Sequence, residues 1–244
     1  MKLPKMILFD YGDTLIYEPS HDYLRGQRAV CDYIKNNKNN LTPEQINDFS
    51  EALYQKLSIV RDIGIEMHEW HFERFLYDYL EIELSISMKE AEKIFWYNAS
   101  PELPMPNIVK LLDYINERDI ISGVISNIGF SGGTLSERIN EILPRNKFKF
   151  IIASSEYMYR KPNPMLFELA LKKAGIDAEN TWFCGDSLRA DIIGANSAGM
   201  FPVWYDNQSI ENPWRIQNND VDPGCEYLHI QDWNELIEIL EGLS

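Results

Sequence analysis

Apolar runs of two kinds alternate along residues 107–204, and this alternation constrains the fold more than any other feature of the sequence. Short runs rich in β-branched or aromatic residues predict strands, whereas apolar residues three and four apart predict helices. The predicted strands are residues 120–125, 148–153, 181–184 and 200–204, and helices are predicted to begin near residues 107, 131, 163 and 189. Such alternation is typical of a parallel sheet with right-handed crossovers. We therefore expect a doubly wound α/β core, closed by an amphipathic helix near residues 236–240.

One more strand is predicted at the start of the chain, where the apolar run of residues 6–9 ends in Asp10 and a turn that contains Gly12. In open parallel sheets, ligands bind beyond the carboxyl ends of the strands. Asp10 would lie at such an end. An aspartate in this position is more often a turn residue than a functional one, so Asp10 gains meaning only from polar residues further along the chain.

The next segment, residues 17–98, has helix signals and no strand signals. Two capping boxes predict helix starts, Thr42 with Gln45 and Ser87 with Glu90. An asparagine-rich patch at residues 36–40 predicts a loop. Closely spaced prolines at residues 101, 104 and 106 mark the return of the chain, because proline cannot continue a helix. We therefore expect an all-helical domain of residues 17–98 inserted into a core of residues 1–16 and 99–244.

Charge and cysteine content limit the class of protein. The formal net charge is −15, whereas nucleic acids and anionic membranes are bound by basic surfaces, so neither is expected as a partner. The sequence shows no apolar run long enough to cross a bilayer and no signal peptide. The three cysteines are scattered, which favours a reducing, cytoplasmic location. The sequence gives no indication of the oligomeric state or of a specific substrate.

Four polar residues follow predicted strands or lie beside their ends. They are Asp10, Ser126, Lys161 and Asp186. The two aspartates offer the oxygen ligands that Mg²⁺ prefers, the lysine offers a cation, and the serine offers a hydroxyl group beside free backbone N–H groups. This set suits a phosphoryl group that is neutralised by metal and lysine while a carboxylate attacks it.

Four segments resemble, in order, motifs I to IV of the haloacid dehalogenase-like superfamily. They are residues 9–15 (Phe-Asp-Tyr-Gly-Asp-Thr-Leu), Ser126-Asn127, residues 160–164 (Arg-Lys-Pro-Asn-Pro) and residues 185–191 (Gly-Asp-Ser-Leu-Arg-Ala-Asp). The residues that continue the fourth segment, through Ala198-Gly199-Met200, are also typical of this superfamily. The resemblance covers nearly the whole core and implies a Rossmann-like fold. It also implies that residues 17–98 are a helical type 1 cap.

The resemblance implies a hydrolase with Asp10 as nucleophile, which would form an aspartyl-phosphate. Mg²⁺ would be held by Asp10, Asp186 and the backbone carbonyl of Gly12, with Asp191 in support. Ser126, the backbone N–H of Asn127 and Lys161 would hold the phosphoryl oxygens. Asp191 could equally serve only to stabilise the start of its helix, where a carboxylate complements the helix dipole.

Gly12 departs from the pattern of the superfamily's phosphatases. Those phosphatases carry a second aspartate two residues after the nucleophile, at the position of Gly12. It acts as general acid for the leaving group and then as base for water. Asp13 is one residue further on, where the superfamily tolerates several residue types, so it is no evidence of a replacement. Loss of a positioned acid or base costs about 10²–10⁴-fold in rate. A glycine still offers its carbonyl oxygen to a metal.

Three functions therefore stay open. The first and favoured one is a Mg²⁺-dependent phosphatase that acts on a small phosphorylated metabolite. The second is a C–X bond hydrolase of the dehalogenase or phosphonatase kind; the dehalogenases need no metal, and the phosphonatases need a cap lysine, for which Lys56 is the candidate. The third is a weakly catalytic protein that binds a phosphorylated ligand or partner. His68 and His71 could offer an acid from the cap, although packing or surface roles are commoner for such residues.

Overall fold

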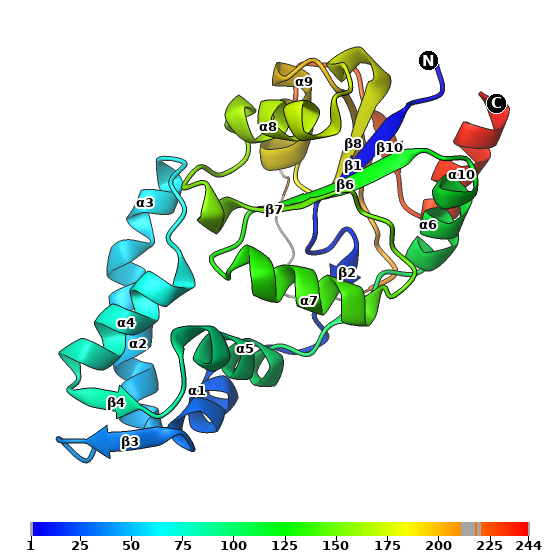
Figure 1. Ribbon diagram of the computed structural model, residues 1–244. Helices are drawn as coiled ribbons and strands as arrows, with labels where there is room; N and C mark the ends of the chain where they lie inside the picture. The colour runs from blue at the N-terminus through cyan, green and yellow to red at the C-terminus, as the bar shows by residue number, and fades with distance from the viewer. Residues whose placement is uncertain (1, 211–217, 219–220, 244) are drawn as a thin grey trace.

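Six parallel strands form one sheet in the larger part of the molecule (Figure 1). The computed structural model describes residues 2–210, 218 and 221–243. The strands are β1 (Met6–Phe9), β6 (Ile121–Ser126), β7 (Ile151–Ala153), β8 (Thr181–Gly185), β9 (Phe201–Tyr205) and β10 (Leu228–Ile230). Their order is β10-β9-β8-β1-β6-β7, and each neighbouring pair is parallel. The chain thus builds the sheet outward from β1 in both directions, which places the topological switch point beside β1.

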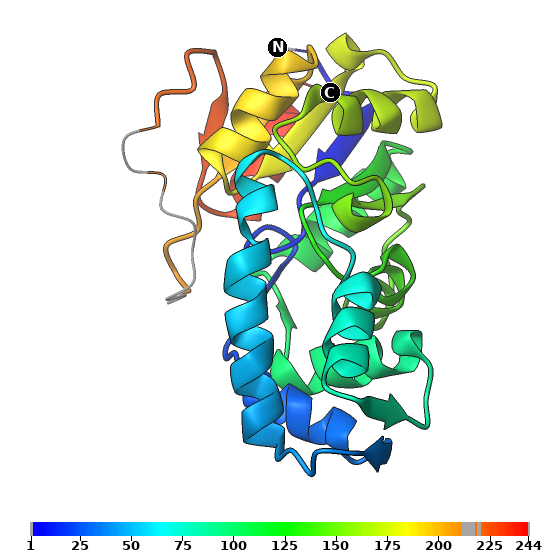
Figure 2. The ribbon, with the colours of Figure 1, turned by 90° about the vertical axis from the view of Figure 1, so that its left-hand side faces the viewer.

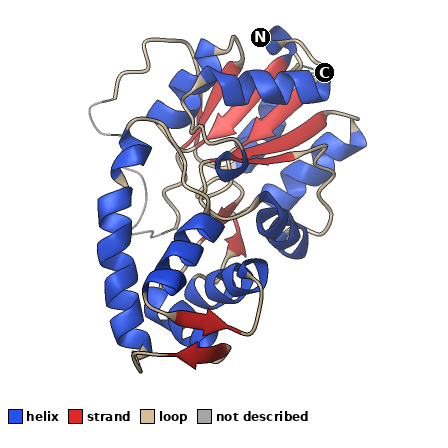
Figure 3. Cartoon of the chain, turned by 60° about the vertical axis from the view of Figure 1, so that its left-hand side comes forward, coloured by secondary structure: helices blue, strands red, loops and turns tan. Residues whose placement is uncertain are grey.

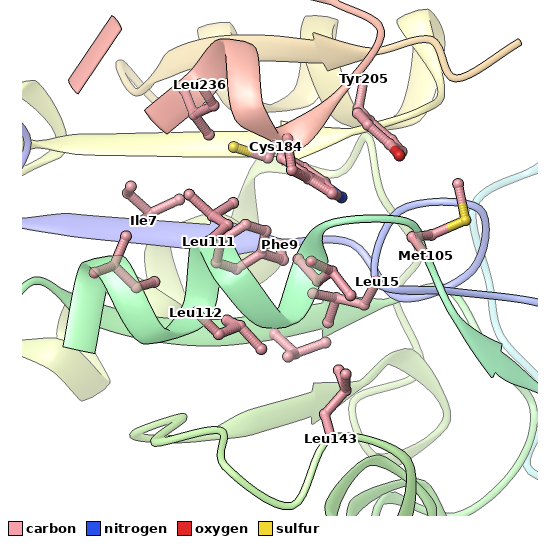
Figure 4. Packing of buried hydrophobic residues seen from close by; sticks show 14 of the residues in the cluster. Ile7, Phe9, Leu15, Met105, Leu111, Leu112, Leu143, Cys184, Tyr205 and Leu236 are labelled. Carbon is pink, nitrogen blue, oxygen red and sulfur yellow. The ribbon is translucent and has the colours of Figure 1, made fainter. Parts of the chain in front are cut away.

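Alternating side chains of β1 explain why helices cover both faces of the sheet. All four residues of β1 are fully buried. Ile7 and Phe9 pack into a cluster with α6 (Ile108–Glu117), α7 (Gly132–Ile142) and α10 (Trp233–Gly242), as Figure 4 shows in part. Met6 and Leu8 pack on the other face, with α8 (Pro164–Ala174) and α9 (Gly194–Ser197). The expected doubly wound α/β core is confirmed.

Details of the core differ from the sequence prediction. The strand predicted at residues 148–153 begins only at Ile151, although the Phe148 ring still packs against Phe9, with 6.2 Å between ring centroids. Residues 189–198 do not form one α-helix. A π-helical turn, η3 (Leu188–Ile193), precedes α9, because the Ile192 N–H donates to the Ser187 carbonyl five residues earlier (3.2 Å). Strand β10 and two short 3₁₀ turns, η1 (Ser154–Glu156) and η2 (Ala178–Asn180), have no counterpart in the prediction.

Five helices make up most of the segment between β1 and the prolines. They are α1 (Tyr23–Cys31), α2 (Pro43–Leu57), α3 (Ile59–Asp62), α4 (Glu69–Tyr79) and α5 (Met88–Ala99). Both predicted capping boxes are confirmed: the Thr42 and Ser87 side chains each accept a hydrogen bond from the backbone three residues on, and the side chain there bonds back. These bonds satisfy N–H groups that the first helical turn leaves unpaired.

The expectation that this segment is entirely helical is wrong. Strands β3 (Ile34–Asn37) and β4 (Ile82–Leu84) pair antiparallel at its outer end (Figure 3). Each is only a few residues long and half exposed, so neither has the apolar alternation that marks a strand in a sequence. The asparagine-rich patch at residues 36–40, predicted as a loop, has its first two residues in β3, which the sequence pattern did not reveal.

The inserted segment has a hydrophobic cluster of its own and also contacts the core. The cluster draws only on residues 30–95, among them Val30, Ile46, Phe72 and Leu76. The two chain connections lie side by side, because β2 (Ile16–Tyr17) pairs with β5 (Leu103–Pro104). In Figure 2, α2 and α3 run from the outer end of the insert toward the core, and the residues after α3 bond to the core loop at residues 158–160. No helix in the described ranges is long and apolar enough to cross a membrane.

Candidate active site

Three strand ends beside the switch point position the predicted site residues. Asp10 follows β1, and its backbone N–H donates to the carbonyl of Cys184 in β8 (2.9 Å). Ser126 is the last residue of β6, on the other side of β1, and Asp186 follows β8. Because the strands are parallel, all three residues lie at the same edge of the sheet. They line one cavity.

Lys161 lies between two of the carboxylates. Its Nζ is 2.6 Å from Oδ1 of Asp10 and 2.7 Å from Oδ1 of Asp191, and its side chain is buried. The amide side chain of Asn127 fixes the Lys161 backbone, since it donates to the Lys161 carbonyl (2.9 Å) and accepts from the Lys161 N–H (2.7 Å). Burial alone would lower the pKa of Lys161, but the charges of Asp10 and Asp191 outweigh it and raise that pKa. The ammonium group is therefore charged and held in place.

The three carboxylates form a cluster with more negative charge than Lys161 can balance. Oxygens of Asp10, Asp186 and Asp191 all lie within 4.8 Å of one another. Burial, followed by the neighbouring Asp191 and Asp10 charges, raises the pKa of Asp186 well above its usual value. Oδ1 of Asp186 is buried and has no hydrogen-bond partner in the described part of the chain. A divalent cation that takes oxygen ligands fits this set of residues, because it would supply both the missing charge and the missing partner.

The loop after β8 holds Asp191 against the strand end. The Ser187 N–H donates to Asp191 Oδ2 (3.0 Å), while Oδ1 faces Lys161. Gly185 leaves the space for this carboxylate, since a Cβ there would lie 2.3 Å from the Asp191 Cγ. Asp191 thus has a local structural contact and a place in the charged cluster at the same time.

Gly12 borders the same cavity and has free space around it. A Cβ on Gly12 would meet no atom within 4 Å, and the backbone is outside the left-handed region, where side chains are disfavoured. Asp13, by contrast, has a φ of 53°. A carboxylate could therefore be accommodated at residue 12, two residues from Asp10.

The cavity has a volume of about 960 Å³ and lies between the sheet edge and the inserted segment. Arg61, Ile63 and Trp96 line it from the insert. Neither His68 nor His71 lines it. His68 instead caps α4, where its Nδ1 accepts from the Trp70 N–H (3.2 Å).

Sequence reasoning gave no role to Arg61, Arg160 and Arg189, the three arginines that line this cavity. Arg160 lines the cavity beside Lys161, within a segment in which the sequence points to the lysine alone. Arg61 lies on the four-residue helix α3, and no sequence pattern marks it. Lys56, the candidate for a reactive cap lysine, is exposed on α2 and does not line the cavity.

Curated proteins similar to this chain include several phosphatases. The chain is 26% identical over 205 residues to the glyceraldehyde 3-phosphate phosphatase of Pyrococcus abyssi, which covers 82% of this chain and 81% of that protein. It is 27% identical over 250 residues to the pyrimidine 5'-nucleotidase PynA of Streptococcus pneumoniae, with 98% of each chain covered. The pyrimidine 5'-nucleotidase YjjG of Escherichia coli is 29% identical, with 85% of this chain and 88% of that protein covered.

Solved structures show the same fold, and the sequence matches a family profile. The 2-haloacid dehalogenase of Pseudomonas syringae pv. Tomato superposes with a TM-score of 0.64 at 21% identity, covering 99% of this chain and all of that one. A phosphatase from Thermococcus onnurineus gives 0.60 at 18% identity, covering 99% of each chain. The profile of the haloacid dehalogenase-like hydrolases matches residues 7–204. The chain belongs to the haloacid dehalogenase-like hydrolase family.

Proposed function

We propose that this hydrolase is a Mg²⁺-dependent phosphatase that acts on a small phosphorylated metabolite through an aspartyl-phosphate on Asp10. The observation that carries the proposal is the position of Lys161, whose Nζ lies within 2.7 Å of both Asp10 and Asp191 at the floor of a large cavity. A fixed cation beside a potential carboxylate nucleophile suits a phosphoryl group. Similarity to proteins named as phosphatases and nucleotidases supports the same reaction.

Asp10, Asp186 and the backbone carbonyl of Gly12 would hold Mg²⁺, with Asp191 in support. The buried Asp186 oxygen that lacks a partner supports this assignment, as does the excess of negative charge. When bound, Mg²⁺ would neutralise charge on the phosphoryl oxygens and help to orient them.

The chain's own residues would act in two steps. In the first, a carboxylate oxygen of Asp10 attacks phosphorus, the Asp10–phosphorus bond forms and the bond to the leaving oxygen breaks. Lys161 and the hydroxyl of Ser126 hold the phosphoryl oxygens meanwhile, together with the N–H of Asn127. In the second step water attacks phosphorus and gives up a proton to solvent, and the Asp10–phosphorus bond breaks, which releases inorganic phosphate and restores the Asp10 carboxylate.

Gly12 affects both steps, because no side chain there can give a proton to the leaving oxygen or take one from water. We therefore expect efficient cleavage only of esters whose leaving group departs unprotonated, such as aryl and acyl phosphates. Dephosphorylation of Asp10 should also be slow.

The other functions have less support in the site. A dehalogenase would not need the carboxylate cluster around Asp186, and Lys56 lies outside the cavity that a phosphonatase lysine would have to reach. A protein that only binds phosphate would need Lys161 and Ser126 but no nucleophile.

A substrate screen with and without Mg²⁺ tests the proposal. The purified protein is offered phosphomonoesters, acyl phosphates, phosphonoacetaldehyde and 2-haloacids after treatment with a chelator. We expect phosphate release from aryl and acyl phosphates only after Mg²⁺ is restored. Metal-independent turnover of a 2-haloacid would replace the phosphatase with a dehalogenase, and binding of phosphate without any turnover would favour the non-catalytic function.

A further inference from the structure

Two of the arginines that line the cavity, one from the insert and one from the core, share one buried carboxylate. Arg61 comes from α3 of the insert, and Arg160 is the core residue next to Lys161. Nε of Arg61 is 3.4 Å from Glu66 Oε1, and the Arg160 guanidinium forms an ion pair with Glu66 Oε2. The Ser154 hydroxyl also donates to Glu66 Oε2 (2.9 Å). Each oxygen of the Glu66 carboxylate therefore faces one of the two guanidinium groups.

One carboxylate cannot balance the charge of both arginines. Burial lowers the pKa of Arg160, and the nearby charge of Arg61 lowers it further, against the opposite effect of Glu66. Glu69 also lies near Arg61, but burial raises the pKa of its carboxyl group to about 7, so it is only partly ionised at neutral pH. Asp62 is exposed to solvent. A partly buried cation with insufficient counter-charge is stabilised by an anionic ligand.

Two backbone hydrogen bonds hold the segment around Glu66 against the segment that carries Arg160. The Arg160 N–H donates to the carbonyl of Gly64 (2.9 Å), and the Glu66 N–H donates to the carbonyl of Met158 (2.6 Å). These bonds join residues 64–66 of the insert directly to residues 158–160, which lead into Lys161. Arg61 and Arg160 line the same cavity as Asp10 and Lys161. One ligand with two charged ends could therefore meet Lys161 with one end and the two arginines with the other.

We propose that Arg61 and Arg160 form a second anion subsite, which selects phosphomonoesters that carry another anionic group, a carboxylate or a second phosphate. The inference rests on the proposed phosphatase function and specifies its substrate class. Within the described residues the Arg160 side chain bonds to Glu66, so further N–H groups of its five are available for a ligand. The flat guanidinium matches the two oxygens of a carboxylate or phosphate.

Three phosphate esters with the same three-carbon skeleton test the subsite. Glycerol 3-phosphate, glyceraldehyde 3-phosphate and 3-phosphoglycerate end in an alcohol, an aldehyde and a carboxylate. We expect the highest kcat/KM for 3-phosphoglycerate. Arg61→Met should reduce that preference by roughly 10–100-fold, the usual effect of losing one hydrogen bond to a charged group. Because Arg160 keeps its ion pair with Glu66, this variant leaves no buried carboxylate without a partner.

Lys56→Met is the matched control, since it removes a cation from α2, which precedes α3, but outside the cavity. It should leave the preference unchanged. Fructose 1,6-bisphosphate against fructose 6-phosphate shows whether a second phosphate is accepted as well as a carboxylate. Equal kcat/KM for all three-carbon esters, or equal effects of Arg61→Met and Lys56→Met, would overturn the subsite and leave the phosphatase function standing.

If the wild-type protein hydrolyses none of these alkyl esters, calorimetry with Mg²⁺ decides on the subsite alone. The proposed function fails only if aryl and acyl phosphates are not hydrolysed either. Tighter binding of 3-phosphoglycerate than of glycerol 3-phosphate, lost in Arg61→Met, would support the subsite. Equal affinities, or no binding of either ester, would overturn it.

Discussion

Two groups of buried carboxylates, one at the sheet edge and one in the insert around Glu69 and Glu73, differ in what surrounds them. At the sheet edge, Asp10 and Asp191 both contact Lys161 in the wall of a large cavity. In the insert, burial and the neighbouring acids raise the pKa of Glu73 well above its usual value, and no lysine or arginine is among the groups that shift it. One oxygen of Glu73 is buried without a partner in the described residues. The first group contains a buried cation that contacts two of its carboxylates, whereas Glu73 has none and favours the protonated, neutral form.

Glu92 of the insert shows a third outcome of burial. Its carboxylate accepts hydrogen bonds from the backbone N–H and the hydroxyl of Ser131 and from the hydroxyl of Thr134, each 2.6 Å long. Since Ser131 caps α7 of the core, Glu92 joins the insert to the core. A buried carboxylate is therefore a sign of function only when a cation and a cavity accompany it, as they do at Asp10.

Among substitutions in the two groups, Asp10→Asn should reduce turnover the most. An amide cannot attack phosphorus as a carboxylate does, so turnover should fall by on the order of 10⁶-fold, as it does when other enzymes lose their nucleophile. The measurement is the steady-state rate on an aryl phosphate with Mg²⁺, with circular dichroism to show that the variant folds. Glu73→Gln makes the same kind of change in the other group and should keep the wild-type rate. Wild-type turnover by folded Asp10→Asn would show that Asp10 is not the nucleophile.

A smaller change is expected for Gly12→Asp, which adds a carboxylate to the first group. The variant should fold, because a Cβ at this position meets no atom within 4 Å. Turnover of alkyl phosphates should rise by some part of the roughly 10²–10⁴-fold that a positioned general acid supplies, and turnover of aryl phosphates by less. The comparison of both rates in wild type and variant is the measurement. A folded variant that binds Mg²⁺ and gains on neither ester would mean that another group already supplies the proton.

The smallest effect is expected for Glu69→Gln in the insert, which should change the pH dependence of the protein's stability. Burial, and after it the charge of Glu92, raises the pKa of Glu69 from 4.5 to about 7. Between these values the unfolded chain loses this proton while the folded chain keeps it, so the free energy of unfolding falls as pH rises, and the loss is complete above pH 7. This fall in the free energy of unfolding is on the order of 1–3 kcal/mol, and Glu69→Gln should abolish it, because glutamine does not titrate. Urea unfolding of both proteins at pH 5 and pH 8 measures these free energies. If the variant and the wild type lost the same free energy of unfolding between the two pH values, the prediction would be wrong.

The sequence was sufficient where strong local patterns and strand order determine the structure. Buried strands such as β1 and β8, separated by capped helices, predicted the sheet, and parallel strands place Asp10, Ser126 and Asp186 at one edge whatever the details of packing. The antiparallel pair β3 and β4 could not be predicted, because strands this short and half exposed carry no apolar alternation.

Contacts between distant segments were also beyond the sequence. The ion pairs of Glu66 with Arg61 and Arg160 depend on how the insert meets the core, and 94 residues separate Glu66 from Arg160. Asn127 was expected to act only through its backbone N–H. Its side chain instead also holds the backbone of Lys161, 34 residues further along the chain. Such partners have no fixed spacing, so no local motif reveals them.

Trapping the phosphorylated chain would identify the nucleophile itself. The protein is mixed with an aryl phosphate and Mg²⁺, quenched in acid within milliseconds to seconds, and analysed by peptide mass spectrometry. Because Gly12 provides no base for the attacking water, we expect phosphate to accumulate on the peptide that contains Asp10, up to about one group per chain. It should be absent without Mg²⁺ and in Asp10→Asn. Hydrolysis of the ester with no phosphorylated peptide, or with the phosphate on a residue other than Asp10, would contradict the proposed role of Asp10.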